Sequence, residues 1–361
     1  MAEARHHGLD AARALAMVAV LAGHAAISFM ETPIGWAIQD DYRHLGVDLS
    51  IWILASFAMP GFFWLSGYFA RAVHEHGGPG GFLRHRVTRV LAPLLVALVP
   101  CSLALDALWD WGREVGGRAE VATNIPKLQA SGLPITLGHL WYLYYLLAMS
   151  LVAAAVVPLA RRLRVGALHG GALLLLVAAI VIGVLAAMRT LHLDTPLGFV
   201  IDLPVAAYMG AFLLWGWHVH AHPGDLDRYA RHAWHAAAAA LLLLLAAVSV
   251  LHDAADPSRT APPPLYAIAA SGLFTMALII AFVGLCHRFA RRRAFFRLAS
   301  EASYWFYVAH LPIVVFLQIA LAHLGIPGPL KYAAIIAATT AACLATYDLV
   351  IRRTRLRRVL G

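Results

Sequence analysis

The chain has 361 residues, of which 61% are hydrophobic and only 13% are charged, and its mean hydropathy is +0.73. In soluble domains about a quarter of the residues carry charge, so a soluble enzyme or binding module is excluded. The net charge of +9 would suit nucleic-acid binding if the basic residues formed one patch, but they lie in short clusters beside apolar segments. We therefore expect a polytopic membrane protein that does not bind nucleic acid.

Ten apolar segments are long enough to cross a bilayer as helices. They are Leu9–Phe29, Ile51–Ala72, Val90–Trp111, Gly138–Ala160, Ala167–Met188, Phe199–Trp217, Ala233–Leu251, Leu265–Leu285, Ser303–His323 and Leu330–Ile351. The connections between them are too short for a separate soluble domain. The sequence therefore predicts one all-α membrane helix bundle over residues 1–361, with both termini on the same side.

The distribution of arginines predicts on which side of the membrane the termini lie. Arginines gather in alternate connections and in the tail, at Arg84–Arg89, Arg161–Arg164, Arg288–Arg297 and Arg352–Arg358, and are sparse in the opposite connections. Because cytoplasmic loops carry an excess of Lys and Arg, we expect both termini to be cytoplasmic.

The first segment carries three ionisable residues, Asp10, Arg13 and His24. Such residues are rare in membrane helices and point to a function by default. On a helix Arg13 and His24 lie within about 20° of each other and roughly 16 Å apart along the axis. Arg13 could anchor an anionic ligand near the cytoplasm, with Asp10 orienting its guanidinium, while His24 does acid–base chemistry deeper in the membrane. Alternatively, Arg13 snorkels to the surface and His24 bonds a neighbouring helix.

Polar residues also mark the predicted cytoplasmic end of the second and third segments. Ser66, Gly67 and Tyr68 allow helices to approach closely and supply hydroxyl groups. Arg86 and Arg89 share a face at the expected start of a helix, beside the positive end of its dipole, where they could hold a phosphate or a nucleotide. The alternative is that both arginines snorkel to anionic lipid.

The fourth segment begins with HLWYLYYLL. We expect its aromatic residues in the interfacial belt of the membrane, although Trp and Tyr also form stacking platforms for sugars. These residues are Trp141, Tyr142, Tyr144 and Tyr145. His139 then lies at the external mouth of the bundle, as a structural residue or a contact for a substrate.

The ninth segment contains a second intramembrane histidine, His310. It favours a wet internal cavity, or else it braces a contact between helices. The histidines between His218 and His235 are expected in a cytoplasmic loop and lack a tight ligand pattern, so we expect no metal site there. Cys101, Cys286 and Cys343 lack metal-ligand spacing and are expected to be packing residues.

Five stretches together resemble the acyltransferase-3 family of integral-membrane O-acyltransferases, and within it the branch of the glucan biosynthesis protein C type. They are LDAARALAMVAVLAGHA, MPGFFWLSGYFARA, HRVTRVLAPLL, HLWYLYYLL and ASYWFYVAHLPIVVF. The resemblance spans most of the chain and keeps the order of the family's motifs.

This resemblance implies transfer of an acyl group from a cytoplasmic coenzyme A thioester to a carbohydrate across the bacterial inner membrane. In the glucan branch the group is succinyl and the acceptor is an osmoregulated periplasmic glucan. By match to the family's motifs, His24 would be catalytic and Arg13 would hold the coenzyme. Arg86 and Arg89 would bind its phosphates, and Ser66 and Tyr68 match the family's SGY element.

From these observations we expect His24, Asp10 and His310 in catalysis, and His139 and Trp141 at the acceptor carbohydrate. We expect acyl-CoA as a donor substrate without a tightly bound cofactor, membrane lipids as surroundings, and a possible homo-oligomer. One rival interpretation is a transporter of sugar or lipid-linked sugar, but the motifs occur once each and no self-similar halves are present. Another is an acetyl-CoA-dependent enzyme acting on a different envelope glycan.

Overall fold

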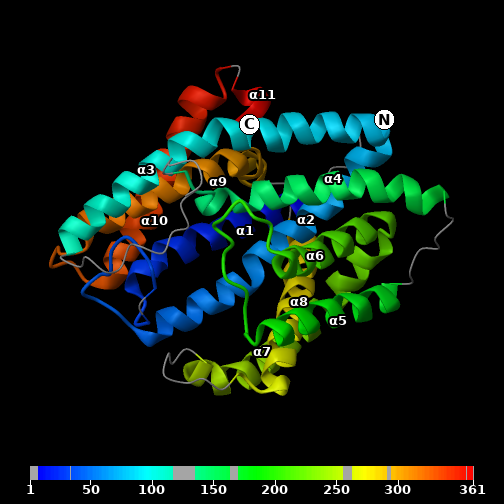
Figure 1. The fold of residues 1–361 in the computed structure, drawn as a ribbon, viewed down its shortest axis with the longest axis horizontal. Helices are drawn as coiled ribbons and strands as arrows, with labels where there is room; N and C mark the ends of the chain where they lie inside the picture. Colours follow the sequence, from blue (N-terminus) through cyan, green and yellow to red (C-terminus); the bar gives the residue numbers. More distant parts are fainter. Residues whose placement is uncertain are drawn as a thin grey trace.

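The computed structural model describes residues 7–32, 34–116, 135–162, 170–254, 262–290, 294–354 and 356–360. In these ranges the chain forms helices joined by loops and contains no strand, which confirms the predicted all-α bundle (Figure 1). Some of the arginines that predict the orientation lie outside the described residues, namely Arg164, Arg291, Arg292, Arg293 and Arg355.

Eight helical stretches among the described residues are long and apolar enough to cross a membrane. The helices are α1 His7–Ala26, α2 Leu45–Arg86, α3 Ala92–Gly116, α4 Trp141–Arg162, α5 Gly170–Met188, α6 Leu203–Ala221, α7 Gly224–Ala254, α8 Leu265–Phe289, α9 Ala294–Leu321, α10 Gly328–Thr346 and α11 Arg357–Leu360. One stretch, Leu45–Gly116, contains two predicted spans, so the eight stretches account for nine of the ten. The tenth is α6, whose Trp, Tyr and His residues lower its mean hydropathy.

Helix α2 is broken near its end, where the backbone of Gly78 adopts φ 61° and ψ −171°. Pro79 follows at a position that suits the first turn of a helix, because its missing N–H needs no partner there. The helical segment that carries Arg86 therefore begins about two turns before it, and a π-helical stretch, Val87–Leu91, continues directly into α3. The expectation that Arg86 and Arg89 sit at a helix start is wrong, and the positive end of the dipole is not beside them.

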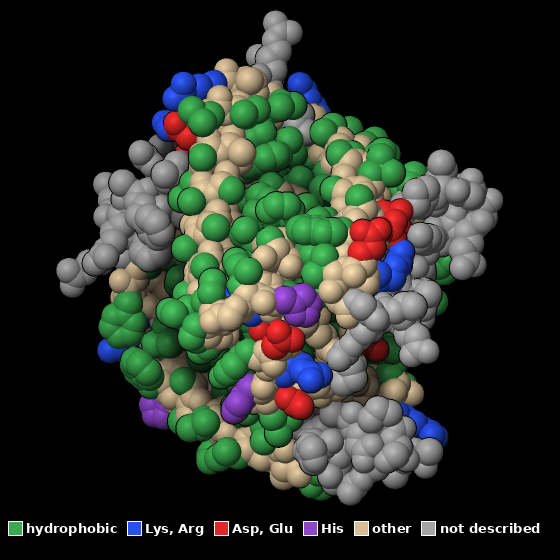
Figure 2. Space-filling model, turned by 90° about the vertical axis from the view of Figure 1, so that its left-hand side faces the viewer, with side chains coloured by type: hydrophobic (Ala, Val, Ile, Leu, Met, Phe, Trp, Pro, Cys, Tyr) green, Lys and Arg blue, Asp and Glu red, His purple; other side chains and the backbone are tan. Residues whose placement is uncertain are grey.

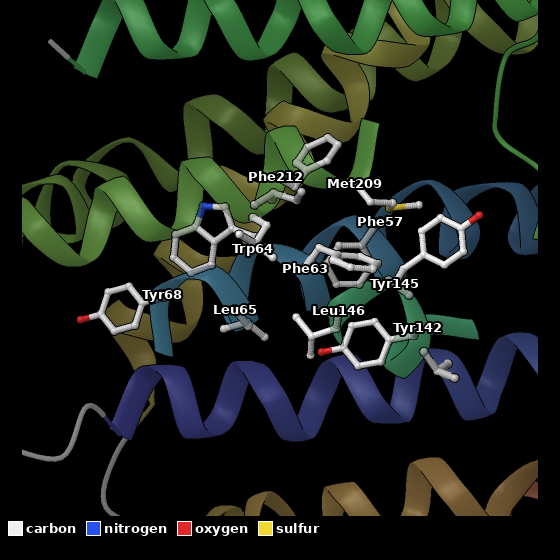
Figure 3. Packing of buried hydrophobic residues seen from close by; sticks show 14 of the residues in the cluster. Phe57, Phe63, Trp64, Leu65, Tyr68, Tyr142, Tyr145, Leu146, Met209 and Phe212 are labelled. Carbon is white, nitrogen blue, oxygen red and sulfur yellow. The ribbon is translucent and has the colours of Figure 1, made fainter. Parts of the chain in front are cut away.

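The core is centred on α2 and α6, which pack at backbone distance. Gly67 lies against the carbonyl group of Leu213, and Gly216 lies against that of Trp64. A side chain at either glycine would collide with the opposite backbone, so the small residues set the approach of these two helices, as the sequence predicted for Gly67. Figure 3 shows Trp64 and Phe212 meeting across this contact.

Trp141, Tyr142 and Tyr145 of α4 are buried in this core and Tyr144 is half-buried, so the expectation of an interfacial belt is wrong. Trp141 is 5% exposed and Tyr145 is fully buried. The Tyr144 hydroxyl donates to the carbonyl oxygen of Phe199 at 2.8 Å. These side chains contact neighbouring parts of the bundle: the rings of Trp141 and Tyr142 pack against Phe63 of α2 at 6.0 Å and 5.0 Å. Figure 3 shows Tyr142 and Phe63 in this packing.

One further expectation concerns histidines in the second half of the chain. The histidines placed in a cytoplasmic loop are mostly helical: His218 and His220 lie in α6, and His232 and His235 lie in α7. Only a short connection around Pro223 separates the two helices. Helices α5 and α7 lie at the edge of the molecule, and their apolar windows are the least buried of the candidate spans (Figure 1).

Candidate functional site

A large cavity opens among the residues predicted to be cytoplasmic. Its volume is about 940 Å³, within the ~300–1,000 Å³ typical of ligand pockets. Four arginines line it, namely Arg13, Arg86, Arg89 and Arg357, and we therefore call it the arginine cavity. Among the described residues of its wall, Glu301 is the only acidic one. The arginines come from α1, the α2–α3 junction and α11, so segments far apart in sequence supply one basic surface.

Several polar groups of the cavity wall have no hydrogen-bond partner. Arg86 is 5% exposed and its Nε is unpartnered, as are the hydroxyl of Tyr304 and Nδ1 of His85. Buried polar groups normally have partners, so these three groups are available to a bound molecule or to water. Guanidinium groups and hydroxyls are the donors that bind phosphate.

Ser66 of α2 and Tyr142 of α4 meet in the wall of this cavity. The Ser66 hydroxyl lies 2.5 Å from the Tyr142 hydroxyl, and both residues line the wall. Arg13 lies beside them in the same wall, with its guanidinium over the ring of Phe69 at 4.2 Å. The first helix therefore presents Arg13 to the cavity.

Tyr307 connects the cavity to a cluster of three histidines. Its ring lines the cavity and lies 5.6 Å from the His139 ring and 6.3 Å from the His310 ring. Its hydroxyl donates to the carbonyl oxygen of His139. A ligand that fills the cavity therefore reaches the edge of the cluster at Tyr307.

The cluster joins α1, α9 and the 3₁₀ turn before α4. His24 Nδ1 lies 3.0 Å from His310 Nε2, and the ring of His139 packs edge-on against that of His310 at 5.4 Å. His310 is completely buried and His139 is 6% exposed, whereas His24 is half-buried. The structure thus brings together three histidines that the sequence places on separate spans. Among the described residues, no group of three or more His, Cys, Asp or Glu side chains is arranged to hold a metal ion.

A second, smaller pocket of about 230 Å³ lies at the opposite end of the bundle. We call it the Trp36 pocket; its wall is formed by Trp36, Ala37, Ile38, Gln39, Asp40, Asp41, Arg43, Gly112, Arg113, Gly116 and His323. Figure 1 shows the loop between α1 and α2, the end of α3 and the turn after α9 at this left-hand end. Figure 2 faces the same end and shows charged and histidine side chains gathered among hydrophobic ones.

Trp36 links this pocket to the histidine cluster. Its ring stacks on the ring of His24 at 6.2 Å with an angle of 11° between the planes. Its Nε1 donates to Gln318 Oε1, and Gln318 Nε2 in turn donates to the carbonyl oxygens of His24 and Ala25. Gln318 therefore satisfies carbonyl groups at the end of α1 and fixes Trp36 against His24.

The structure separates the predicted residues into two groups. Arg13, Ser66, Arg86 and Arg89 line the arginine cavity, and His24, His139 and His310 form the cluster. Tyr68 instead packs against Trp64 and against His220 of α6. Trp141 packs against Phe63 and Tyr145. Neither lines the cavity or the Trp36 pocket.

The remaining prediction for this group is Asp10, which lies one turn before Arg13 on α1 and is half-buried. Sequence reasoning missed Trp36, Gln318, Tyr304 and Arg357. The spacing of His310 and Gln318, eight residues apart on one face of a helix, was the one available signal for Gln318.

Comparison with known families decides what kind of protein carries this site. The family model of the acyltransferase-3 family, described as an acyltransferase domain, matches residues 6–348. The chain belongs to the acyltransferase-3 family. No curated protein and no solved structure matches it. The match covers α1 through α10, so it includes the histidine cluster, the Trp36 pocket and every residue of the arginine cavity wall except Arg357 of α11.

Proposed function

We propose that this membrane acyltransferase moves an acyl group from a coenzyme A thioester in the arginine cavity to a hydroxyl group presented at the Trp36 pocket. The observation that carries the proposal is the position of His24 between the two. It contacts Trp36 on one side, and on the other it contacts His310, which packs against Tyr307 of the cavity wall.

The donor site is supported by charge and by length. The unpartnered Arg86 Nε and the neighbouring arginines suit the phosphates of the coenzyme, which are polyanionic. Arg13 and His24 are about 16 Å apart along α1, so an extended pantetheine arm can run from the basic mouth toward the histidines. The nucleotide then stays near the cytoplasm while the thioester enters the membrane.

Neutral His24 can act as general base in this arrangement. It would take a proton from the acceptor hydroxyl while the hydroxyl oxygen attacks the thioester carbon, a contribution of about 10²–10⁴-fold to the rate. The C–S bond breaks as the C–O bond forms, and the coenzyme leaves as a thiol after it receives the proton. Asp10 would take no direct part in the transfer and would orient the guanidinium of Arg13.

We further propose that the donor is succinyl-CoA, that the acceptor is an osmoregulated periplasmic glucan and that the membrane is the bacterial inner membrane. The support is the resemblance of HLWYLYYLL and the ninth span to the glucan branch of the family. His139 remains the proposed acceptor contact, because its side chain lies in the histidine cluster. Trp36 is a better placed stacking partner for a sugar than the buried Trp141.

The test is acyl transfer by the purified protein in detergent, with radiolabelled succinyl-CoA or acetyl-CoA and a linear or cyclic glucan. His24→Ala is compared with His235→Ala, a histidine exposed on the surface of α7. We expect label in the glucan from succinyl-CoA with the wild type and His235→Ala, and none with His24→Ala. Label from acetyl-CoA alone would overturn the succinyl assignment and keep the enzyme class. Absence of transfer from both donors, with movement of glucan across reconstituted vesicles, would favour a transporter.

A further inference from the structure

The hydrogen bonds of His310 determine where its proton lies. Its Nδ1 is 2.9 Å from the carbonyl oxygens of Phe306 and Tyr307. A carbonyl oxygen accepts and never donates, so Nδ1 of His310 carries a hydrogen. The described contacts of this fully buried ring are these two carbonyl groups and the rings of His24, His139 and Tyr307, without a carboxylate. An unpaired buried charge is costly, so the ring is neutral and its Nε2 bears a lone pair.

The lone pair of His310 then fixes the tautomer of His24. The atom 3.0 Å from His310 Nε2 is His24 Nδ1, which must donate the hydrogen of this bond. A neutral imidazole has one N–H, and the bond made by one nitrogen decides the state of the other. His24 Nε2 is therefore the unprotonated, basic nitrogen.

The surroundings hold this arrangement in place. His139 donates from its own Nε2 to the carbonyl oxygen of Val308 at 3.0 Å, so that N–H does not compete for the lone pair of His310. On the opposite side, Trp36 stacks on the His24 ring, and Gln318 binds the backbone of His24. Both the ring plane and the backbone of His24 are thus fixed by α9 and the loop that follows α1.

We propose that His310 is a positioning residue that holds His24 in its Nδ1–H tautomer, so that His24 Nε2 accepts the proton of the attacking hydroxyl. This inference rests on the proposed function and deepens it. In the transfer step the hydroxyl proton moves to His24 Nε2, the oxygen forms its bond to the acyl carbon, and the C–S bond breaks. The leaving thiolate then takes the proton from Nε2. His24 Nδ1–H remains bonded to His310 throughout and stabilises the transient imidazolium.

Two substitutions of His310 separate this role from packing. In His310→Gln the side-chain amide oxygen can accept the His24 Nδ1 hydrogen from about the position of Nε2, whereas His310→Leu offers no acceptor. We expect His310→Leu to lower kcat by about 10²–10⁴-fold, as loss of a tautomer-fixing partner does in other enzymes, with little change in the KM for acyl-CoA. His310→Gln should recover kcat to within about tenfold of the wild type. Equal kcat values for the two variants, at equal thermal stability, would overturn the proposal.

A spectroscopic measurement tests the tautomer without relying on activity. In protein labelled with ¹⁵N-histidine, the signal of His24 is identified by its loss in His24→Gln. We expect a protonated Nδ1 and an unprotonated Nε2 in the wild type and in His310→Gln, and a change in His310→Leu. An unprotonated Nδ1 in the wild type would overturn the proposal even in an active enzyme. A protonated Nδ1 in a protein that transfers no acyl group would leave the tautomer correct and refute the proposed function instead.

Discussion

Arg86 is the single side chain that bears most directly on the proposed donor site in the arginine cavity. It is 5% exposed, its Nε has no partner, and its guanidinium lies 4.9 Å from the ring of Phe82. An arginine that snorkels to the surface buries its stem and keeps its guanidinium exposed, whereas Arg86 is buried as a whole residue, so its burial favours the phosphate-binding role over the lipid-binding one. The sequence alone does not distinguish phosphate binding from lipid binding, because the spacing of Arg86 and Arg89 suits both.

Replacing Arg86 should weaken donor binding selectively. A hydrogen bond to a charged group contributes about 1.5–3 kcal/mol, so we expect Arg86→Gln to raise the KM for acyl-CoA by about 10–100-fold with little change in kcat. A short thioester that lacks the nucleotide should be used equally well by the variant and the wild type. Arg353→Gln is the matched control, because Arg353 is 64% exposed and pairs with Asp348. An equal loss with both donors would contradict a nucleotide-binding role.

Individual site residues were predictable where one helix carries the information. The spacing of Arg13 and His24 on the first apolar segment is sufficient to place them on one face. The contacts of Gln318 with His24 and Trp36 were not predictable, because they join parts of the chain that are hundreds of residues apart in sequence. Trp36 is close to His24 in sequence, but only the path of the loop after α1 brings its ring onto that of His24. The position of Tyr68 on the α6 side of α2 was not predictable, because the sequence does not say which face of α2 meets α6.

At the scale of helices, the contact between α2 and α6 positions one wall of the site. Gly67 and Gly216 let the two backbones meet, which turns Ser66 and Phe69 of α2 toward the arginine cavity and Tyr68 toward α6. The fixed approach also buries Trp64 and Trp215 against each other. The wall of the cavity therefore depends on residues that never touch it.

Gly216→Ala tests this contact. The added methyl group would collide with the carbonyl oxygen of Trp64, and overpacking of this kind costs about 1–3 kcal/mol. We expect a lower midpoint of thermal unfolding in detergent and a reduced yield of folded protein. Gly210→Ala, on the same helix, adds a methyl group with no atom within 4 Å and should leave the midpoint unchanged or raise it. Equal stability of the two variants would contradict the close packing of α2 and α6.

Hydropathy predicted where the helices lie, but it did not predict the break in α2 or the surroundings of the aromatic residues of α4. The break at Gly78 depends on a positive φ that only local backbone geometry reveals, and it moved the start of the helix that carries Arg86. The aromatic residues of α4 have the composition of an interfacial belt, but the neighbouring helices bury them. Composition reports how much apolar surface a helix has, and packing decides what that surface meets.

For the whole molecule, the alternation of loops places the two candidate sites at opposite ends. The arginine cavity collects the start of α1, the α2–α3 junction, the start of α9 and α11, which were all predicted to be cytoplasmic. The Trp36 pocket collects the opposite loops, and a buried ion pair between Asp40 and Lys331 at 2.8 Å ties the loop after α1 to the start of α10. The relative placement agrees with the positive-inside prediction.

Labelling of single cysteines tests the absolute orientation. In a background with Cys101, Cys286 and Cys343 replaced by Ala, Asp41→Cys and Arg353→Cys each introduce an exposed thiol, because the native side chains are 76% and 64% exposed. A membrane-impermeant maleimide added to spheroplasts should label Asp41→Cys at once and Arg353→Cys only after lysis. Labelling of both thiols before lysis would contradict the opposite placement of the two ends.

The most direct test of the account is acyl transfer across a sealed membrane. Proteoliposomes whose orientation is measured with the Arg353→Cys thiol receive labelled acyl-CoA on the side of the arginine cavity and glucan on the side of the Trp36 pocket. We predict label on the glucan, no label when the two substrates exchange sides, and loss of transfer in His24→Ala with retention in His235→Ala. Transfer that occurs only when donor and acceptor share one side would contradict a reaction path that runs through the bundle past His24.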